Sequence, residues 1–203
     1  MHNLINAFPL YKFLKYCNKS SLEKIILDCG AGGSNPPLTL FKEFGYKTYG
    51  IEISEEQLEK AKSFCDLKNI DLNIIRGDMK KIPFSDGFSS FLFSYNTSVH
   101  MKKGDFLDAI SEFYRVLRPG GLCYVNFLSK DCQTYGKGIK VGNGEYIQTE
   151  DNKEVLYSHY SEMEAEQNFS GFEIIYKEKR IIQRRINEEE YTSGYLDYIL
   201  LKK

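Results

Sequence analysis

A short apolar run that ends in a glycine-rich turn is the feature that most limits what this chain can fold into. The run KIILDC spans residues 24–29, and the segment from Gly30 to Ser34 follows it directly. Near-continuous apolar character is typical of a strand buried on both faces of a parallel sheet, because a strand with one solvated face alternates. Glycines at the carboxyl end of such a strand let the backbone approach a ligand closely. A tight turn without a ligand is the alternative for this segment taken alone.

Four further apolar runs repeat this arrangement, at residues 49–53, 72–78, 88–95 and 122–128. A capping box, Ser54 to Gln57, starts one intervening helical pattern, and the apolar residues from Phe106 to Leu117 recur at helical spacing. Strands that alternate with helices predict βαβ units and therefore an α/β protein with a doubly wound parallel sheet. Two later runs, 172–186 and 195–203, are joined by a polar turn and predict an antiparallel hairpin.

The remaining segments complete a single domain over residues 1–203. Residues 1–20 predict an N-terminal helix with an aromatic buried face. Residues 131–170 are polar and glycine-rich before a second helix start at Ser161 and Glu164, and we interpret them as an insertion that covers the substrate. The aromatic residues assigned to the buried face of the first helix are Phe8, Tyr11, Phe13 and Tyr16.

The composition excludes several function classes. Lys and Arg number 27 against 28 for Asp and Glu, so the net charge of −1 gives no field for capturing nucleic acid, and we expect no such partner. No apolar run approaches the roughly 18 residues of a membrane span. The five cysteines form no CxxC pair and have no histidine at ligand spacing, which argues against a disulfide framework or a metal site. We therefore expect a cytoplasmic protein without a membrane or metal partner.

Acidic residues end the first three apolar runs. Asp28 precedes the glycines, where it either accepts hydrogen bonds from loop amides or faces a cationic ligand. Glu52 is placed to accept the two hydroxyls of a ribose. Asp78 can accept from the exocyclic amine of a base while Met79 packs against its face. Each acid taken alone could also be an ordinary strand-end residue, but the carboxyl ends of parallel strands share one crevice, with residues 94–101 as a further wall.

Together these segments resemble the class I S-adenosylmethionine-dependent methyltransferases, in particular small proteins with the methyltransferase type 11 domain. The resemblance runs from about Leu22 to Leu128 and is weaker from there to Lys203. The matching segments, in chain order, are Asp28-Cys29-Gly30-Ala31-Gly32, Glu52 in GIEIS, Gly77-Asp78 followed by IPF, and LRPGG at 117–121. The resemblance implies a Rossmann-like seven-stranded sheet in the order 3-2-1-4-5-7-6 with strand 7 antiparallel, and S-adenosylmethionine as the cofactor. Where the family often has a third glycine this chain has Ser34, and Gly33 supplies the same freedom one position earlier.

The resemblance also implies which residues hold the cofactor, and it says less about the acceptor, which we expect to be a small molecule. The catalytic residue is unknown. The best candidate is His100, as a base for an alcohol or ammonium acceptor or as a substrate contact. The alternative is a loop histidine that packs against the cofactor or caps the next helix. His159 either lines the substrate pocket or has a surface role, and we set His2 aside. The cofactor-binding residues are expected to be Asp28, Gly30, Ala31, Gly32, Glu52, Ile53, Gly77, Asp78, Met79, Ser94 and Tyr95.

Two other functions compete with methyl transfer. A non-catalytic module that binds S-adenosylmethionine and regulates a partner is compatible with the lack of an acceptor-specific motif. A nicotinamide-dependent oxidoreductase is disfavoured because Asn35 interrupts the GxGxxG spacing and because the tail is antiparallel. The acceptor, the atom that is methylated and the oligomeric state are left open by the sequence.

Overall fold

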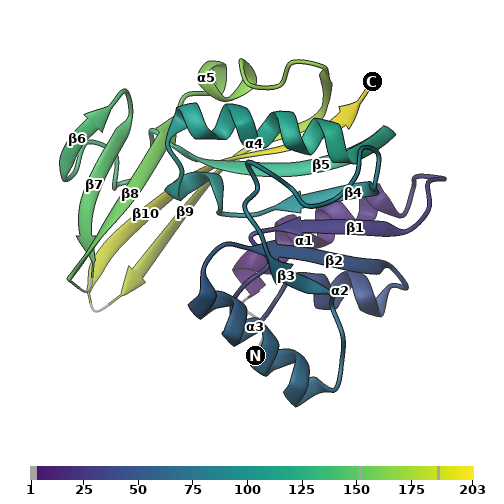
Figure 1. The fold of residues 1–203 in the computed structure, drawn as a ribbon. Coiled ribbons are helices and arrows are strands. Elements are labelled where there is room, and N and C mark those ends of the chain that lie inside the picture. Colours follow the sequence, from purple (N-terminus) through teal and green to yellow (C-terminus); the bar gives the residue numbers. More distant parts are fainter. Residues whose placement is uncertain (1–3, 151, 187) are drawn as a thin grey trace.

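The central sheet follows the predicted order. The computed structural model describes residues 4–150, 152–186 and 188–203, so His2 lies outside the described residues. From one edge, β3 (Ile74–Arg76), β2 (Lys47–Glu52), β1 (Ile25–Cys29), β4 (Ser89–Ser94) and β5 (Leu117–Ser129) pair in parallel (Figure 1). Antiparallel to β5 runs β10 (Glu189–Lys202), and β9 (Phe172–Ile186) pairs antiparallel with β10. The order 3-2-1-4-5-7-6 with an antiparallel strand 7 is confirmed.

Helices cover both faces of this sheet (Figure 1). Because side chains alternate across a strand, Phe91 and Phe93 of β4 join the core under α1 (Leu4–Cys17) and α2 (Leu38–Glu43), whereas Leu92 joins the core under α4 (Lys103–Val116). The predicted amphipathic pattern is the buried face of α4. The helix α3 (Glu55–Lys68) begins at the predicted cap, where the Ser54 hydroxyl accepts a hydrogen bond from the Gln57 amide.

The aromatic face expected of the N-terminal helix is only half correct. Phe13 is fully buried and Tyr16 is half-buried, but Phe8 and Tyr11 are 57% and 54% exposed. At about 3.6 residues per turn, Phe8 and Tyr11 lie on the side of α1 opposite to Phe13 and Tyr16. The aromatic character of these four residues therefore did not suffice to predict which of them are buried, because burial depends on their angular position around the helix.

The segment 131–170 forms a small sheet that the sequence analysis did not predict. Its strands are β6 (Ile139–Gly142), β7 (Glu145–Glu150) and β8 (Lys153–Tyr160), paired antiparallel, and α5 (Glu162–Glu166) follows with its predicted capping box. β8 pairs in parallel with the last residues of β5, beyond the point where the pairing of β4 with β5 stops. β10 pairs with the opposite edge of β5. The insertion therefore extends the sheet beyond the carboxyl end of β4 (Figure 1).

A buried ion pair fastens the last two strands to β5. The Arg180 guanidinium of β9 donates through Nε to Asp197 Oδ2 of β10 at 2.6 Å and through Nη2 to Oδ1 at 3.1 Å. The hydroxyl of Tyr124 on β5 donates to Asp197 Oδ1 at 2.6 Å. Since Asp197 is 2% exposed, these donors replace the water that its carboxylate loses on folding.

We expect Asp197→Ala to destabilise the fold by about 3–5 kcal/mol, because it leaves the Arg180 cation and the Tyr124 hydroxyl without their partner. The matched control is Glu56→Ala, which removes the exposed ion pair with Lys60 and should leave the free energy of unfolding almost unchanged. Urea unfolding followed by circular dichroism measures both losses. Equal losses would contradict a structural role for the buried pair.

Candidate functional site

The loop after β1 folds back onto the end of β2. The amides of Gly30 and Ala31 both donate to the carbonyl of Ile51, at 2.9 and 3.0 Å. The Glu52 carboxylate accepts from the Gly32 amide through Oε2 at 3.1 Å and from the Ser54 amide through Oε1 at 2.8 Å. Each carboxylate oxygen can accept two hydrogen bonds, so each retains acceptor capacity after these bonds are made. Glu52 can therefore accept two more donors from the crevice.

The glycines of this loop also serve the packing of the protein itself. Gly30 has a φ of +95°, and a Cβ there would lie 2.0 Å from the Thr97 side chain. A Cβ on Gly32 would lie 2.6 Å from Glu52 Oε2. Neighbouring side chains therefore already require these two glycines, whether or not a ligand approaches the loop. Gly33, at φ +94°, has the left-handed conformation expected of it in place of Ser34.

Asp28 presents a buried acceptor without a partner. It is 1% exposed, and within the described residues its Oδ2 accepts no hydrogen bond. The amides of the glycine loop donate to Ile51 and Glu52, so the alternative in which they bond Asp28 is wrong. Burial, and secondly the nearby Glu52 carboxylate, raise the pKa of Asp28 well above its usual range. A cation at this point would relieve both effects.

The end of β3 lies beside Glu52, as predicted. The Gly77 amide donates to the Glu52 carbonyl at 3.0 Å. Asp78 Oδ1 accepts from the Lys80 amide at 2.9 Å, which fixes the turn that carries it. Met79 is half-buried and packs against the core under α4, whereas Ile53 is exposed. The Gly77 contact therefore places the end of β3 beside Glu52, and Asp78 is the next residue along the chain.

The end of β4 is tied to the end of β1 through a residue that the sequence analysis did not select. Ser94 Oγ lies 2.5 Å from Thr97 Oγ1, and the Thr97 hydroxyl donates to the Cys29 carbonyl at 3.3 Å. Tyr95 is half-buried and stacks against Phe93. No local pattern marks Thr97, because its role depends on a contact across 68 residues of chain.

His100 faces the insertion. It ends the short helix η1 (Ser98–His100), is exposed, and its Nδ1 lies 3.0 Å from the Leu156 carbonyl of β8. A carbonyl only accepts, so Nδ1 carries a proton, and in the neutral ring Nε2 is then an acceptor. This is the tautomer that a general base requires. The ring also packs edge-on against Tyr157, with centroids 5.2 Å apart.

His159 is fully buried, so the surface role considered for it is wrong. Its Nδ1 lies 3.3 Å from the Gly144 carbonyl, and its Nε2 lies 2.8 Å from Thr134 Oγ1. Because Nδ1 donates, Nε2 accepts from the Thr134 hydroxyl while Cys132 is a thiol. The same hydroxyl lies 3.1 Å from Cys132 Sγ and can turn to donate to the thiolate. Burial alone would raise the pKa of Cys132, but hydrogen bonding to His159 and Thr134 lowers it to about 6.

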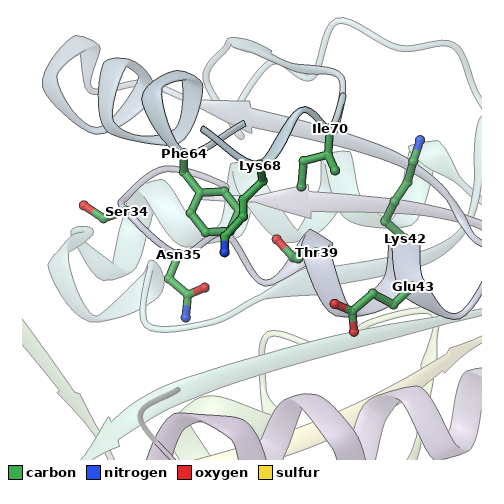
Figure 2. A pocket seen from close by; sticks show the side chains of 8 residues that line it. All are labelled: Ser34, Asn35, Thr39, Lys42, Glu43, Phe64, Lys68 and Ile70. Atoms are coloured by element: carbon green, nitrogen blue, oxygen red, sulfur yellow. The ribbon is translucent and has the colours of Figure 1, made fainter. Parts of the chain in front are cut away.

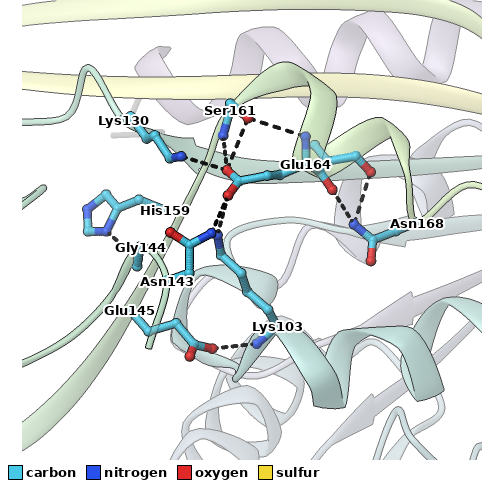
Figure 3. A network of polar contacts seen from close by, with 10 residues as sticks. Lys103, Lys130, Asn143, Gly144, Glu145, His159, Ser161, Glu164 and Asn168 are labelled. Carbon is cyan, nitrogen blue, oxygen red and sulfur yellow. Dashed lines mark hydrogen bonds and ion pairs between the residues drawn. The ribbon is translucent and has the colours of Figure 1, made fainter. Parts of the chain in front are cut away.

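A polar network anchors the insertion to α4 and β5 (Figure 3). Glu164 of α5 accepts from the Ser161 amide at 2.7 Å and pairs with Lys130 at 2.9 Å and Lys103 at 3.4 Å. Burial would raise the pKa of Glu164, but these hydrogen bonds and charges lower it to about 2. Asn143, before β7, donates to the same carboxylate at 2.9 Å. One ionised side chain therefore holds together elements that are distant in sequence.

Two absences hold for residues 4–150, 152–186 and 188–203, which the structure describes. No three or more His, Cys, Asp and Glu side chains gather there in a group that could hold a metal ion. None of the helices within these ranges has the length and apolar character to span a membrane.

Comparison with known proteins agrees with this geometry. Residues 27–125 match the family described as "Methyltransferase domain". The sterol 24-C-methyltransferase of Pneumocystis carinii is 29% identical over 167 residues, which are 76% of this chain and 41% of that protein. The 24-methylenesterol C-methyltransferase 2 of rice is 30% identical over 104 residues, 50% of this chain and 28% of that protein. The chain thus spans less than half the length of these relatives. A solved S-adenosylmethionine-dependent methyltransferase from Methanosarcina mazei shares the fold, with a TM-score of 0.73, 20% identity and coverage of 93% of this chain and 96% of that one.

The Cys132 thiol should react with iodoacetamide with a midpoint near pH 6, since the reactive thiolate forms at that pH. Thr134→Val removes the hydroxyl between Cys132 and His159 and should move the midpoint upward, toward the ordinary value of 9.0. Peptide mass spectrometry over a pH series measures both. Cys65, whose pKa is raised by burial, is the internal control. The same pH dependence at Cys65 and Cys132 would refute the hydrogen-bonded relay of Cys132, Thr134 and His159.

Proposed function

We propose that this chain is a class I S-adenosylmethionine-dependent methyltransferase, with S-adenosylmethionine as its cofactor, and that it transfers a methyl group to a small-molecule acceptor. The observation that carries the proposal is the pair of carboxylates at the ends of β1 and β2. Asp28 has a buried oxygen without a partner, and Glu52 keeps acceptor capacity on both oxygens.

These residues fit the chemistry of the cofactor. Its ribose carries two hydroxyl donors, which match the remaining acceptor capacity of Glu52. Its amino acid and sulfonium portion is cationic, which suits the unpaired Oδ2 of Asp28. Asp78 and Met79 would hold the adenine, and the loop from Gly30 to Gly32 would line the crevice between them.

When bound, the cofactor supplies a methyl group on a sulfonium with a good neutral leaving group, so orientation of the acceptor can provide up to ~7–11 kcal/mol of the acceleration. The chain's own task is therefore to position the acceptor and to manage its proton. His100 Nε2 is available to accept a proton from an alcohol or ammonium acceptor, while Nδ1 stays bonded to the Leu156 carbonyl. The insertion, held by Glu164, would exclude water from the acceptor side.

A sterol-like acceptor is the first specific candidate. Two curated relatives are named as sterol methyltransferases, and one of them aligns with 76% of this chain. The alignments cover only 41% and 28% of those proteins, so the part of them without a counterpart here could also determine the acceptor. An acceptor panel should therefore contain sterols together with small polar alcohols, amines and thiols.

Isothermal titration calorimetry should show that S-adenosylhomocysteine binds the wild-type protein and that Glu52→Gln weakens binding at least about tenfold, since hydrogen bonds to a charged acceptor are lost. Gly104→Ala is the matched control, because Gly104 of α4 is not among the proposed cofactor-binding residues and a Cβ there meets no neighbour. Absence of binding to the wild-type protein would end the proposal. Unchanged affinity in Glu52→Gln would remove Glu52 from the site.

His100→Asn tests the proposed base. The Asn amide can still donate to the Leu156 carbonyl but cannot accept a proton, so kcat for an alcohol or amine acceptor should fall by about 10²–10⁴-fold while affinity for S-adenosylhomocysteine is unchanged. The measurement is the release of S-adenosylhomocysteine with the best acceptor of the panel, over a pH series. An unchanged kcat and pH profile would show that His100 is not the base.

A further inference from the structure

A hollow of about 550 Å³ opens between α2 and α3 (Figure 2). None of the predicted cofactor-binding residues lines it. Its walls come from Asn35 and Thr39 at the start of α2 and from Phe64 and Lys68 on α3, with Ile70 beyond the helix end. A volume of this size lies within the range of about 300–1,000 Å³ that small-molecule sites occupy.

Polar groups converge in this hollow. Figure 2 shows Lys68 extending beside Phe64 toward Asn35 and Thr39. Thr39 Oγ1 is buried and makes no hydrogen bond within the described part of the chain. A buried hydroxyl without a partner is costly, so a ligand atom that bonds it would be favoured.

The charge of the lining favours an anion. Lys42 and Lys68 both line the hollow, and neither forms an ion pair with any residue that the structure describes. Lys60, also on α3, is by contrast paired with Glu56 at 2.7 Å. The carboxylate of Glu43 also lines the hollow, and two lysines against one glutamate leave one net positive charge.

The other walls are apolar. The ring of Phe64 and the side chain of Ile70 are half-buried and leave part of their surface to the hollow. Phe64 also lines a second hollow of about 440 Å³. We propose that the groove between α2 and α3 binds a small organic anion, with its charged group at Lys68 and Thr39 and its planar apolar body on Phe64, and that this ligand modulates cofactor affinity.

A short path of covalent and hydrogen bonds connects the groove between α2 and α3 to the proposed cofactor contacts. Asn35 lies two residues after Gly33, whose amide donates to the Gln57 carbonyl of α3 at 2.9 Å. Gly32, one residue earlier, donates to Glu52. A ligand that bridges α2 and α3 therefore acts on the same loop that carries the proposed cofactor contacts, and this part of the inference rests on the proposed function.

The test of binding uses 4-fluorobenzoate as the probe, followed by ¹⁹F nuclear magnetic resonance. The wild-type protein should bind it saturably, and Lys68→Ala and Phe64→Leu should each weaken binding about tenfold. Lys62→Ala, on the same helix but outside the hollow, is the matched control and should bind like the wild type. Thermal melting confirms that each variant is folded. Absence of saturation, or equal affinity in the wild type and both groove variants, overturns the proposed site. If inorganic phosphate binds as tightly as 4-fluorobenzoate, the proposed contact between an apolar ligand body and Phe64 is refuted.

The test of coupling measures the affinity for S-adenosylhomocysteine with and without saturating 4-fluorobenzoate. A change of about fivefold or more, matched by an equal change in 4-fluorobenzoate affinity when S-adenosylhomocysteine is saturating, supports the effector role. Saturable binding of both without mutual effect overturns it. If S-adenosylhomocysteine does not bind, the proposed function fails, whereas the titration of the groove with 4-fluorobenzoate still decides whether the anion site exists.

Discussion

The carboxylate of Glu52 is the interaction on which the rest of the site depends. It accepts one amide from the glycine loop after β1 and one from the cap of α3, while its own backbone carbonyl accepts the amide of Gly77. Three strand ends are thereby held in one arrangement before any ligand is present. Preorganisation of this kind lowers the cost of ordering a site when its ligand binds. The same bonds explain why Gly32 tolerates no side chain, since a Cβ would displace the carboxylate.

The acceptor side is built differently, from segments that are distant in the chain. β5 is long enough to pair with β4 near its start and with β8 at its end, while β10 fills the opposite edge. Glu164 then joins the insertion to α4 and to the residue after β5. The acceptor region of the proposed enzyme is therefore part of the sheet itself, and Leu156 of β8 is what orients His100.

Much of the fold could be predicted from the sequence. The apolar runs that became β1 to β5, the helical pattern of α4 and the caps at Ser54 and Ser161 are local signals, because each depends on residues within a few positions. The insertion strands escaped prediction because their polar, glycine-rich sequence carries no clear alternation. The exposure of Phe8 and Tyr11 has another cause, because these residues lie on the side of α1 opposite to Phe13 and Tyr16.

By itself, the sequence determined which segments form the strands and which residues stand at the carboxyl ends of β1, β2 and β3, since these follow from local periodicity and from motif spacing. The strand order followed only from the resemblance to a known family. Only the tertiary structure decided which of those residues have partners. The unpaired oxygen of Asp28, the Thr97 contact behind Gly30, the Cys132–Thr134–His159 relay and the hollow beside Phe64 all arise from residues separated along the chain. Hydrogen-bond satisfaction and empty volume are properties of three-dimensional neighbours, and no local pattern encodes them.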